Sequence, residues 1–407
     1  MARHESFAVL GAGLTGCLAA LEAAERGHSV TVFEREDALF SRASVANEGK
    51  VHLGYVYAAD RSFRTAARLI EDALVFRPVL ERWMTSAAFD ACVYAPFRYV
   101  VPPDSALPVA EIKRHFARVE AHVDARSRAP ERRYLGPGAA DAADSGGTGD
   151  DPRGTGIATR ERGVWPPGIA RAVCNSVASH PRIEVATKTP VRRVDVCGEG
   201  WRVVFDDPAR AAEGPFSIVI NAAWADRRNI DRASGFADRE VWFTRFKFGV
   251  VLNNASRRLT GAMPANATAL SGRYGDSVYF PQDDSLYCCW YPVGMTFSTT
   301  GDHAAAARPD LPDTERAARD TWSGFATVDP DYRRLCALAA PIDVDILGDY
   351  ILAKGASDID DPASRLHQRQ DHGPKRLAPG YWSVETGKYT SAPRCAMQCI
   401  DAILGPG

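Results

Sequence analysis

Apolar and polar positions along the first forty residues predict a strand, a helix and a second strand. Residues 7–10 (FAVL) and 30–33 (VTVF) are short apolar runs, which are typical of strands buried in a parallel sheet. Between them, glycines at 11, 13 and 16 are followed by small and apolar residues up to Gly27, which predicts a helix beginning near Gly13. The chain therefore opens with a βαβ unit.

The rest of the chain contains both helical and strand patterns of apolar residues. Residues 60–84 carry an apolar stripe (Leu69, Ile70, Leu74, Phe76, Leu80) and predict one long helix. Residues 167–179 and 392–404 predict two more helices, and residues 216–220 predict a strand buried on both faces. Shorter strands are predicted at 91–94, 97–101, 183–185, 278–280, 286–291 and 381–384, with a hairpin through 191–194 and 201–205 and alternating strand patterns from about 233 to 345.

This order predicts an α/β nucleotide-binding domain with a β-rich domain inserted into it. At 407 residues the chain exceeds one ordinary core. We expect the nucleotide-binding domain to comprise residues 1–90, 157–232 and 346–407, and the substrate domain 91–156 and 233–345. Residues 136–156 are rich in Gly, Ala, Asp and Ser and predict a mobile loop. This loop is either an insertion without a function or a lid over the active site.

Composition narrows the class of protein. Hydrophobic residues make up 45% and charged residues 25%, as in soluble globular proteins, and a net charge of -2 gives no reason to expect a nucleic-acid partner. We expect no membrane span, because no apolar run approaches the roughly 20 residues that are needed. The first strand leaves no room for a signal peptide, and the nine scattered cysteines contain no CxxC pair, which favours a reduced, cytoplasmic protein without a metal site. The oligomeric state is left open.

The opening glycines form a dinucleotide-binding fingerprint. Gly11 permits a tight turn, Gly13 lets the backbone approach a pyrophosphate, and Gly16 allows close packing of helix on sheet. The helix that follows directs free N–H groups and its positive end at the phosphates. Glu34 ends the second strand, where its carboxylate can accept hydrogen bonds from a ribose and would repel a 2′-phosphate. The sequence predicts an ADP-containing cofactor other than NADP.

Three further motifs, together with the fingerprint, resemble the flavoprotein superfamily of D-amino-acid oxidase and glycine oxidase. They are SVANEGKVHLG at 44–54, VINAAWAD at 219–226 and TGKYTS at 386–391. The first and third are similar to segments of L-2-hydroxyglutarate and glycerol-3-phosphate dehydrogenases, the branch of this superfamily that acts on hydroxy substrates. The resemblance implies a Rossmann-like FAD-binding domain with a mixed sheet and an inserted α+β substrate domain. It also implies FAD as the cofactor, held by Gly11, Gly13, Leu14, Thr15, Gly16, Glu34, Arg35, Ser44, Asn47, Gly49, Lys50, Val51, His52, Val191, Ala222, Ala223, Trp224, Gly387, Lys388, Tyr389 and Thr390.

Two residues in these motifs are candidates for catalysis. Reduced flavin carries negative charge, which Lys388 and the N-terminus of the helix at 392–404 would stabilise; the bland alternative is a solvated lysine beside a strand end. His52 is a candidate base, since oxidation of an alcohol requires a hydroxyl proton to be removed, although lone histidines are often structural. Lys50 either holds the flavin ring or faces water.

The inserted domain offers a candidate substrate clamp. Arg245 and Lys247 alternate with aromatic residues in WFTRFKF, so they share one face of a predicted strand and can bind a carboxylate or another anion. The alternative is a solvated strand face. Tyr279, Tyr287 and Tyr291 either close this cavity or pack in a core.

These features predict an FAD-dependent oxidoreductase that oxidises a CH–NH bond of a small amine or amino-acid-like substrate, with hydride transfer to N5 of the flavin. One alternative is CH–OH oxidation of a hydroxy acid or related alcohol with His52 as the base. The other is a non-catalytic protein that binds a flavin or NAD.

Overall fold

The strand predicted at residues 7–10 lies inside a sheet that has six strands among the described residues. The computed structural model describes residues 4–129, 131–136, 156–198, 200–236, 238–270, 275–295, 297–300, 309–357, 364–365 and 370–407. The predicted loop at 136–156 lies outside them except for its two end residues. The strand order of the sheet is β18-β19-β11-β1-β2-β7, parallel except at β18. The strands are β1 (Ser6–Leu10), β2 (Ser29–Phe33), β7 (Ile183–Ala186), β11 (Ile218–Asn221), β18 (Gly373–Ala378) and β19 (Tyr381–Glu385).

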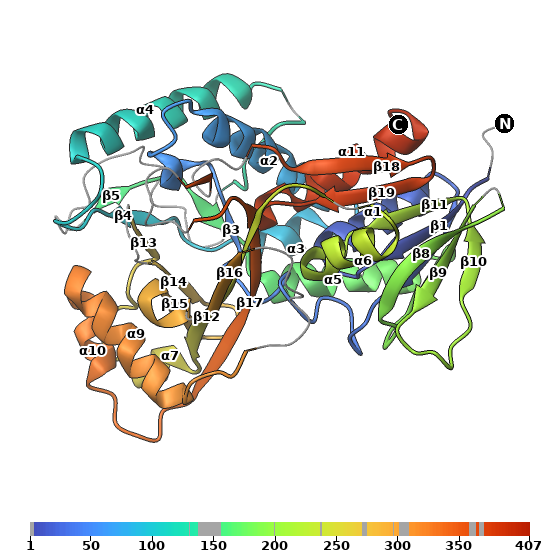
Figure 1. Ribbon diagram of the computed structural model, residues 1–407. Coiled ribbons are helices and arrows are strands. Elements are labelled where there is room, and N and C mark those ends of the chain that lie inside the picture. The colour runs from blue at the N-terminus through green and yellow to red at the C-terminus, as the bar shows by residue number, and fades with distance from the viewer. Residues whose placement is uncertain are drawn as a thin grey trace.

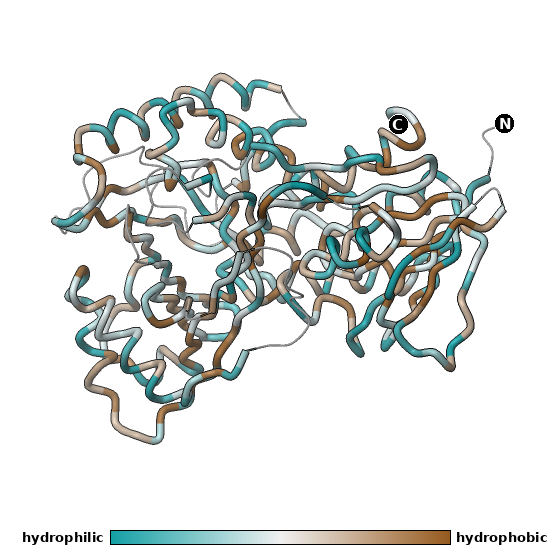
Figure 2. Tube along the Cα trace, viewed as in Figure 1, coloured by the Kyte–Doolittle hydropathy of each residue, from teal (hydrophilic) through white to brown (hydrophobic). Residues whose placement is uncertain are grey.

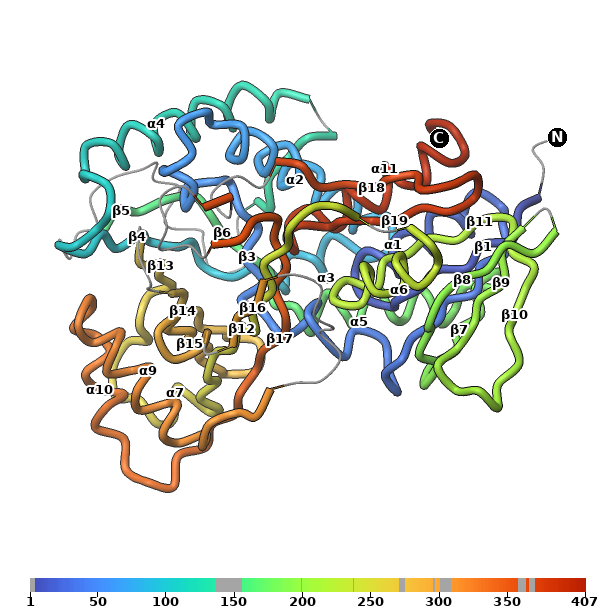
Figure 3. The backbone as a smooth tube through the Cα atoms, in the orientation of Figure 1, coloured from blue at the N-terminus to red at the C-terminus, as the bar shows by residue number. Residues whose placement is uncertain are grey.

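Strands from three distant parts of the chain therefore make up one sheet. Figure 3 shows blue β1 beside green β11, which in turn lies beside red β19. All three are short apolar runs, and hydrophobic stretches follow the strands on the right of Figure 2. This interleaving agrees with a nucleotide-binding domain built from separate segments.

Both faces of this sheet are covered. On one face, α1 (Leu14–Glu25) packs against α5 (Pro166–Ser179) and α11 (Ala392–Leu404), and α11 also contacts α2 (Arg64–Leu80). On the other face, Ala8 and Leu10 of β1 pack with residues of a small antiparallel sheet and of α6 (Arg227–Ala233). That sheet consists, among the described residues, of β8 (Val191–Cys197), β9 (Gly200–Phe205) and β10 (Glu213–Phe216). Burial on both faces explains why the strands of the large sheet read as continuous apolar runs.

A second sheet lies in the left part of Figure 1, from β4 and β5 down to β14 and β15. Its described part has eight strands in the order β16-β12-β15-β14-β13-β4-β5, with β17 also paired to β12. Aromatic residues of β12 and α9 (Thr314–Val328) pack a separate core beneath it. The strands are β4 (Arg98–Val100), β5 (Ile157–Ala158), β12 (Trp242–Leu252), β13 (Ala267–Ala269), β14 (Gly275–Phe280), β15 (Ser285–Trp290), β16 (Phe297–Thr300) and β17 (Val344–Lys354).

Short elements complete the fold around these sheets. A small two-stranded ladder joins β3 (Lys50–Val51) to β6 (Arg162–Gly163), and α4 (Val109–Arg126) packs against α2. The remaining elements are η1 (Tyr55–Tyr57), α3 (Ser86–Asp90), η2 (Trp224–Asp226), α7 (Ala255–Arg258), α8 (Tyr291–Gly294), η3 (Pro330–Tyr332), α10 (Arg333–Cys336) and η5 (Tyr389–Ser391). None of the described helices is both long and apolar enough to cross a bilayer.

Several predicted elements differ from the observed ones. The helix predicted at 60–84 begins only at Arg64, because Phe63 has a left-handed backbone (φ 66°), and it ends at Leu80. The run at 216–220 belongs to two strands, since β10 ends at Phe216 and β11 begins at Ile218. Residues 91–94 form only an isolated bridge, between Val93 and Val164. The strand-rich interpretation of 233–345 was wrong at α9, which is helical.

The domain boundaries stay a prediction, and β17 bears on one of them. It pairs with β12 along its whole length, so residues 346–354 lie in the second sheet and not in the six-stranded one. Through this strand, Asp349 and Tyr350 line the same cavity as residues at the ends of β1 and β2.

Candidate active site

A cavity of about 580 Å³ lies at the carboxyl ends of β1, β2 and β11 and extends to β12 and the C-terminal loop. Most of the predicted site residues line it: Gly11, Gly13, Leu14, Thr15, Glu34, Arg35, Ser44, Asn47, Lys50, His52, Val191, Ala222, Ala223, Trp224, Arg245, Lys247, Gly387, Lys388 and Tyr389. The structure thus brings together residues that lie up to 378 positions apart (11 and 389). Gly16, Gly49, Val51 and Thr390 are not among the residues that line it.

The glycine turn at the start of α1 has the backbone that the fingerprint predicts. Gly11 has φ 98°, and a Cβ there would lie 2.9 Å from the Cα of Ala223. A side chain at Gly16 would overlap the carbonyl oxygen of Gly11, so Gly16 sets the packing of helix on turn and does not face the cavity. The Ser44 hydroxyl accepts a hydrogen bond from Leu14 N at 2.9 Å. A bare backbone therefore lines the end of the cavity beside α1.

Acidic and basic side chains surround this end. The Glu34 carboxylate accepts hydrogen bonds from Ala12 N (2.7 Å) and Glu36 N (3.0 Å), which fixes it at the end of β2. Arg35 forms an ion pair with Asp226, and this pair joins the segment after β2 to the segment after β11. An extended cavity with a helix N-terminus and a fixed carboxylate at one end suits the pyrophosphate and ribose of FAD.

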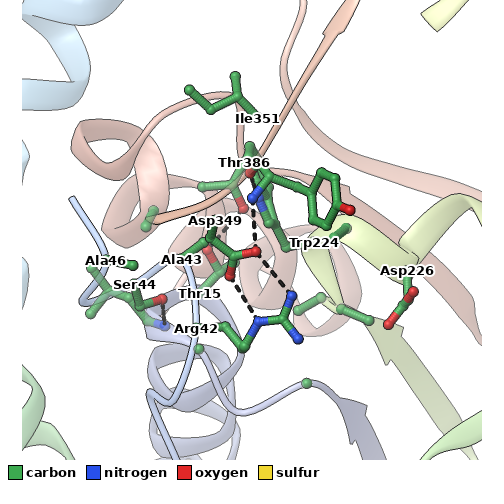
Figure 4. A pocket seen from close by; sticks show the side chains of 18 of the residues that line it. Thr15, Arg42, Ala43, Ser44, Ala46, Trp224, Asp226, Asp349, Ile351 and Thr386 are labelled. Carbon is green, nitrogen blue, oxygen red and sulfur yellow. Dashed lines mark hydrogen bonds and ion pairs between the residues drawn. The ribbon is translucent and has the colours of Figure 1, made fainter. Parts of the chain in front are cut away.

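An arginine–carboxylate pair crosses the cavity from one sheet to the other. The Nε and Nη2 atoms of Arg42 each donate to Asp349 of β17 at 3.0 Å, and Nη1 donates to Glu36 at 2.9 Å. Figure 4 shows Arg42 and Asp349 facing one another, with Trp224 alongside. Such bidentate pairs are geometrically specific, so this one holds β17 against the loop that follows β2. The sequence analysis did not identify either residue.

Buried charges of alternating sign lie at the other end. Lys50 Nζ donates to Asp276 at 2.6 Å and also to Thr268, and Lys247 Nζ lies 3.4 Å from the second oxygen of Asp276 and 3.1 Å from Glu48. Burial would raise the pKa of Asp276, but the charges of Lys50 and Lys247 outweigh it and hold the pKa well below its ordinary value. Lys50 is only 2% exposed, so the prediction that it faces water was wrong. The other alternative, that it holds the flavin ring, stays a prediction.

His52 and Lys388 meet at this end of the cavity. The Nζ atom of Lys388 lies 3.2 Å from Nε2 of His52, whose backbone N donates to the Thr390 hydroxyl at 2.9 Å. Burial, and then the charges of Lys388 and Lys50, lower the pKa of His52 well below its ordinary value. His52 is therefore neutral at neutral pH. Thr390 contributes by holding the His52 backbone from behind.

The two predicted clamp residues share one face of β12, as the alternation required. Arg245 and Lys247 both line the cavity; Arg245 is buried, and the Lys247 side chain is 11% exposed. The charge of Glu48 holds the pKa of Lys247 well above its ordinary value, although burial opposes this. Of the three tyrosines, only Tyr291 lines the cavity, and its hydroxyl donates to Asp276 at 3.2 Å.

A buried carboxylate on α2 holds the C-terminal loop in place. Asp72 accepts hydrogen bonds from the Ser391 hydroxyl (2.6 Å), His372 Nε2 (2.7 Å) and Arg394 Nη1 (3.0 Å). Burial would raise the pKa of Asp72, but these donors and the Arg68 charge keep it below its ordinary value. The loop also meets α1, through Thr15 and Thr386, whose hydroxyl oxygens lie 2.9 Å apart.

Several cavity residues were missed by the sequence analysis: Arg42, Glu48, Tyr57, Asp226, Asp276, Asp349 and Tyr350. Glu48 and Asp226 lie inside quoted motifs, so their position was a usable signal. Nothing local marks Asp276 or Asp349, because each is defined by a partner more than 200 residues away. In the described part of the chain, no cluster of three or more His, Cys, Asp or Glu side chains could hold a metal.

Comparisons with known proteins agree with this geometry. Residues 6–357 match the model of the DAO family, described as FAD dependent oxidoreductase. Over 219 residues the chain is 29% identical to the tRNA 5-methylaminomethyl-2-thiouridine biosynthesis bifunctional protein MnmC of Burkholderia cenocepacia (strain HI2424), a match that covers 54% of this chain and 32% of that protein. The chain thus matches about a third of the length of this curated relative.

Solved structures share the fold along the whole chain. Glycine oxidase from Geobacillus kaustophilus aligns with a TM-score of 0.62 at 14% identity, covering 99% of this chain and 96% of that one. L-alpha-glycerophosphate oxidase from Mycoplasma pneumoniae, solved with FAD bound, has a TM-score of 0.62 at 14% identity and covers 98% and 94%. Because the family model spans most of the sequence and the cavity suits FAD, the chain belongs to the DAO family of FAD-dependent oxidoreductases.

Proposed function

We propose that this enzyme oxidises the C–N bond of a small amine or amino-acid-like substrate that carries an anionic group. The observation that carries the proposal is that three cations, Arg245, Lys247 and Lys388, line one cavity together with a neutral His52. Glycine oxidase shares the fold, and MnmC is a distant relative whose name concerns a methylaminomethyl group. When bound, FAD accepts a hydride from the substrate carbon.

The chain's own residues would hold FAD through the turn at Gly11 and Gly13, the start of α1 and the Glu34 carboxylate. In this arrangement the backbone N–H groups at the start of α1 serve the pyrophosphate and Glu34 serves the ribose. Lys388 would stabilise negative charge that develops at the redox end.

Replacing Gly11 by alanine is expected to yield a folded, colourless protein. The new Cβ would lie 2.9 Å from Ala223 Cα and 3.0 Å from Ala222 O, which pushes the turn out of place. Gly27→Ala is the matched control: its φ of 93° gives a similar backbone cost of roughly 1–2 kcal/mol, but open space surrounds its Cβ. Flavin absorbance per protein measures the result. Equal flavin content in the two variants would contradict the assignment of the turn.

Arg245 and Lys247 would bind the anionic group of the substrate, since both cations face the cavity from one strand. Arg245→Met is expected to raise KM about 10- to 100-fold, equivalent to about 1.5–3 kcal/mol for a hydrogen bond to a charged group. Arg202→Met, an exposed position on β9, serves as control. An unchanged KM in Arg245→Met would remove Arg245 from the substrate site.

The choice between amine and alcohol depends on His52. An alcohol requires a base for its hydroxyl, whereas a neutral amine does not. His52 is a weak base here, because its pKa is lowered by burial and by Lys388, and its Nε2 already faces the Lys388 ammonium. These facts favour an amine. The alcohol alternative keeps one supporting observation, namely that His52 does line the cavity.

Anaerobic mixing with amino acids, secondary amines and hydroxy acids tests the proposal directly. Loss of the flavin's visible absorbance with amines, and not with the matching hydroxy acids, is the expected result. Bleaching by hydroxy acids alone would establish the alcohol alternative instead.

A further inference from the structure

A fully buried carboxylate, Glu161, lies directly behind His52 and does not line the cavity. It sits between β5 and β6, where its Oε2 accepts a hydrogen bond from Leu53 N at 2.6 Å and its Oε1 accepts one from the Tyr99 hydroxyl. The same Oε1 lies 3.7 Å from Nδ1 of His52. Burying an ionised carboxylate costs folding free energy unless opposite charges and hydrogen bonds compensate it.

His52 separates this carboxylate from the cavity. Its Nε2 faces Lys388 Nζ at 3.2 Å, and its buried Nδ1 has no hydrogen-bond partner in the described part of the chain and points towards Glu161. Lys388, His52 and Glu161 therefore form a line that runs from the cavity wall into the interior. A shift of less than about 1 Å brings Nδ1 and Oε1 within hydrogen-bond distance.

His52 and Glu161, the two inner groups of this line, differ in proton affinity. Burial and the Lys388 and Lys50 charges lower the pKa of His52. Burial raises the pKa of Glu161, even though Lys50, Tyr99 and the Leu53 backbone oppose it. A proton that enters the line is thus held poorly by the imidazole and better by the carboxyl group. The ionisable groups that act on Glu161 or titrate with it are His52, Lys50, Tyr94, Tyr99, Tyr55, Tyr134 and Lys388.

We propose that Glu161 is the final acceptor of the proton that the substrate loses, and that the proton reaches it through Lys388 and His52. In one concerted shift, the Lys388 ammonium gives a proton from Nζ to Nε2 of His52 while the Nδ1 proton passes to Oε1 of Glu161. As that N–H bond breaks, Nζ gains a lone pair and takes the proton of the substrate N–H (or O–H) bond, so Lys388 starts and ends as an ammonium. One proton enters at the cavity, one carboxylate is neutralised inside, and no electrons move.

This role rests on the proposed function only in that the substrate must lose a proton. An amine that binds as its ammonium ion meets that condition by losing an N–H proton, and an alcohol meets it by losing its hydroxyl proton. In this proposal His52 passes the proton on and is not the base that keeps it, which fits the low pKa of His52.

Infrared spectroscopy of the substrate-free holoenzyme tests the carboxyl group without turnover. We expect a carbonyl band of a protonated carboxylic acid that titrates above the ordinary range of glutamate and is absent in Glu161→Gln. Glu120→Gln is the matched control, because Glu120 is a partly buried carboxylate on α4 that accepts from Tyr55 and does not contact His52. A band that is missing at every pH, or one that survives in Glu161→Gln, would overturn the proposal. The wild-type titration decides this even if the variant does not fold.

Rapid mixing with an active substrate tests the relay itself. In Glu161→Gln the rate constant of flavin reduction should fall about tenfold or more, as for loss of a positioned proton acceptor, with substrate affinity within about twofold of wild type. The pH dependence of that rate constant should flatten, which a merely structural defect would not produce. A wild-type rate across the pH range in Glu161→Gln would exclude the relay. If no substrate bleaches the flavin, the proposed function fails, while the infrared result still decides the state of Glu161.

Discussion

Replacing Lys388 by methionine is expected to leave the protein yellow while slowing reduction of its flavin by substrate about 100-fold or more, as when one preorganised cationic donor is lost. The ammonium of Lys388 lines the cavity 3.2 Å from His52 and brings positive charge to its inner end. Without it, negative charge on the cofactor is less stable, so the reduction potential should fall as well. Stopped-flow absorbance and a redox titration measure the two effects.

Lys375→Met provides the control for this variant. Lys375 is exposed on β18 and lies 3.8 Å from Glu385, away from the cavity. A second consequence concerns His52: because the Lys388 charge lowers its pKa, the pKa of His52 should rise in Lys388→Met. Retention of both the wild-type rate and the wild-type potential would rule out the electrostatic role of Lys388.

Asp276→Asn is expected to lower the free energy of unfolding by about 3–5 kcal/mol, the cost of breaking a buried ion pair from one side. The change leaves Lys50, which is 2% exposed, and Lys247, whose side chain is 11% exposed, as neighbouring cations. Denaturant unfolding measures the loss. The double variant Asp276→Asn, Lys50→Met should recover part of the stability, because it removes an unpaired charge. A double variant less stable than the single one would show that charge pairing is not the cause.

The same carboxylate predicts how stability depends on pH. The folded-state pKa of Asp276 lies well below its unfolded value, so the unfolded chain binds this proton more readily. The stabilisation is complete above about pH 4, the ordinary aspartate range, and is lost as pH falls further towards the folded pKa. Acid unfolding of Asp276→Asn should therefore be shallower than that of the wild type.

Local sequence patterns predicted the features that depend on near neighbours. The turn at Gly11, the hairpin of β8 and β9, and the alternation that places Arg245 and Lys247 on one face depend on residues within a few positions of each other. The helix α9 could also have been found, because Ala317, Ala318, Thr321, Trp322 and Phe325 repeat at helical spacing after the capping Asp313.

Long-range partners could not be predicted in this way. Arg42 and Asp349 are 307 residues apart, Lys50 and Asp276 are 226 apart, and Leu53 and Glu161 are 108 apart. Each charged residue in these pairs is an ordinary polar residue in its own segment, and only the tertiary fold gives it a partner. Lys50 shows the difference: the sequence left it either at the flavin or in water, and the structure removes the second alternative by burying it against Asp276 and 4.0 Å from the centre of the Phe97 ring.

The place of β19 and the Asp72-bound loop has a consequence for biosynthesis. The six-stranded sheet takes in residues 381–385, and the loop at 386–391 contacts α1 through Thr386 and α2 through Ser391. A nascent chain on the ribosome therefore carries the glycine turn long before the loop that lines the cavity at Gly387, Lys388 and Tyr389 has been translated. We expect the cavity to be complete only after synthesis has passed these residues, and until then the edge of β11 that later pairs with β19 stays unpaired, as an exposed strand edge that favours aggregation.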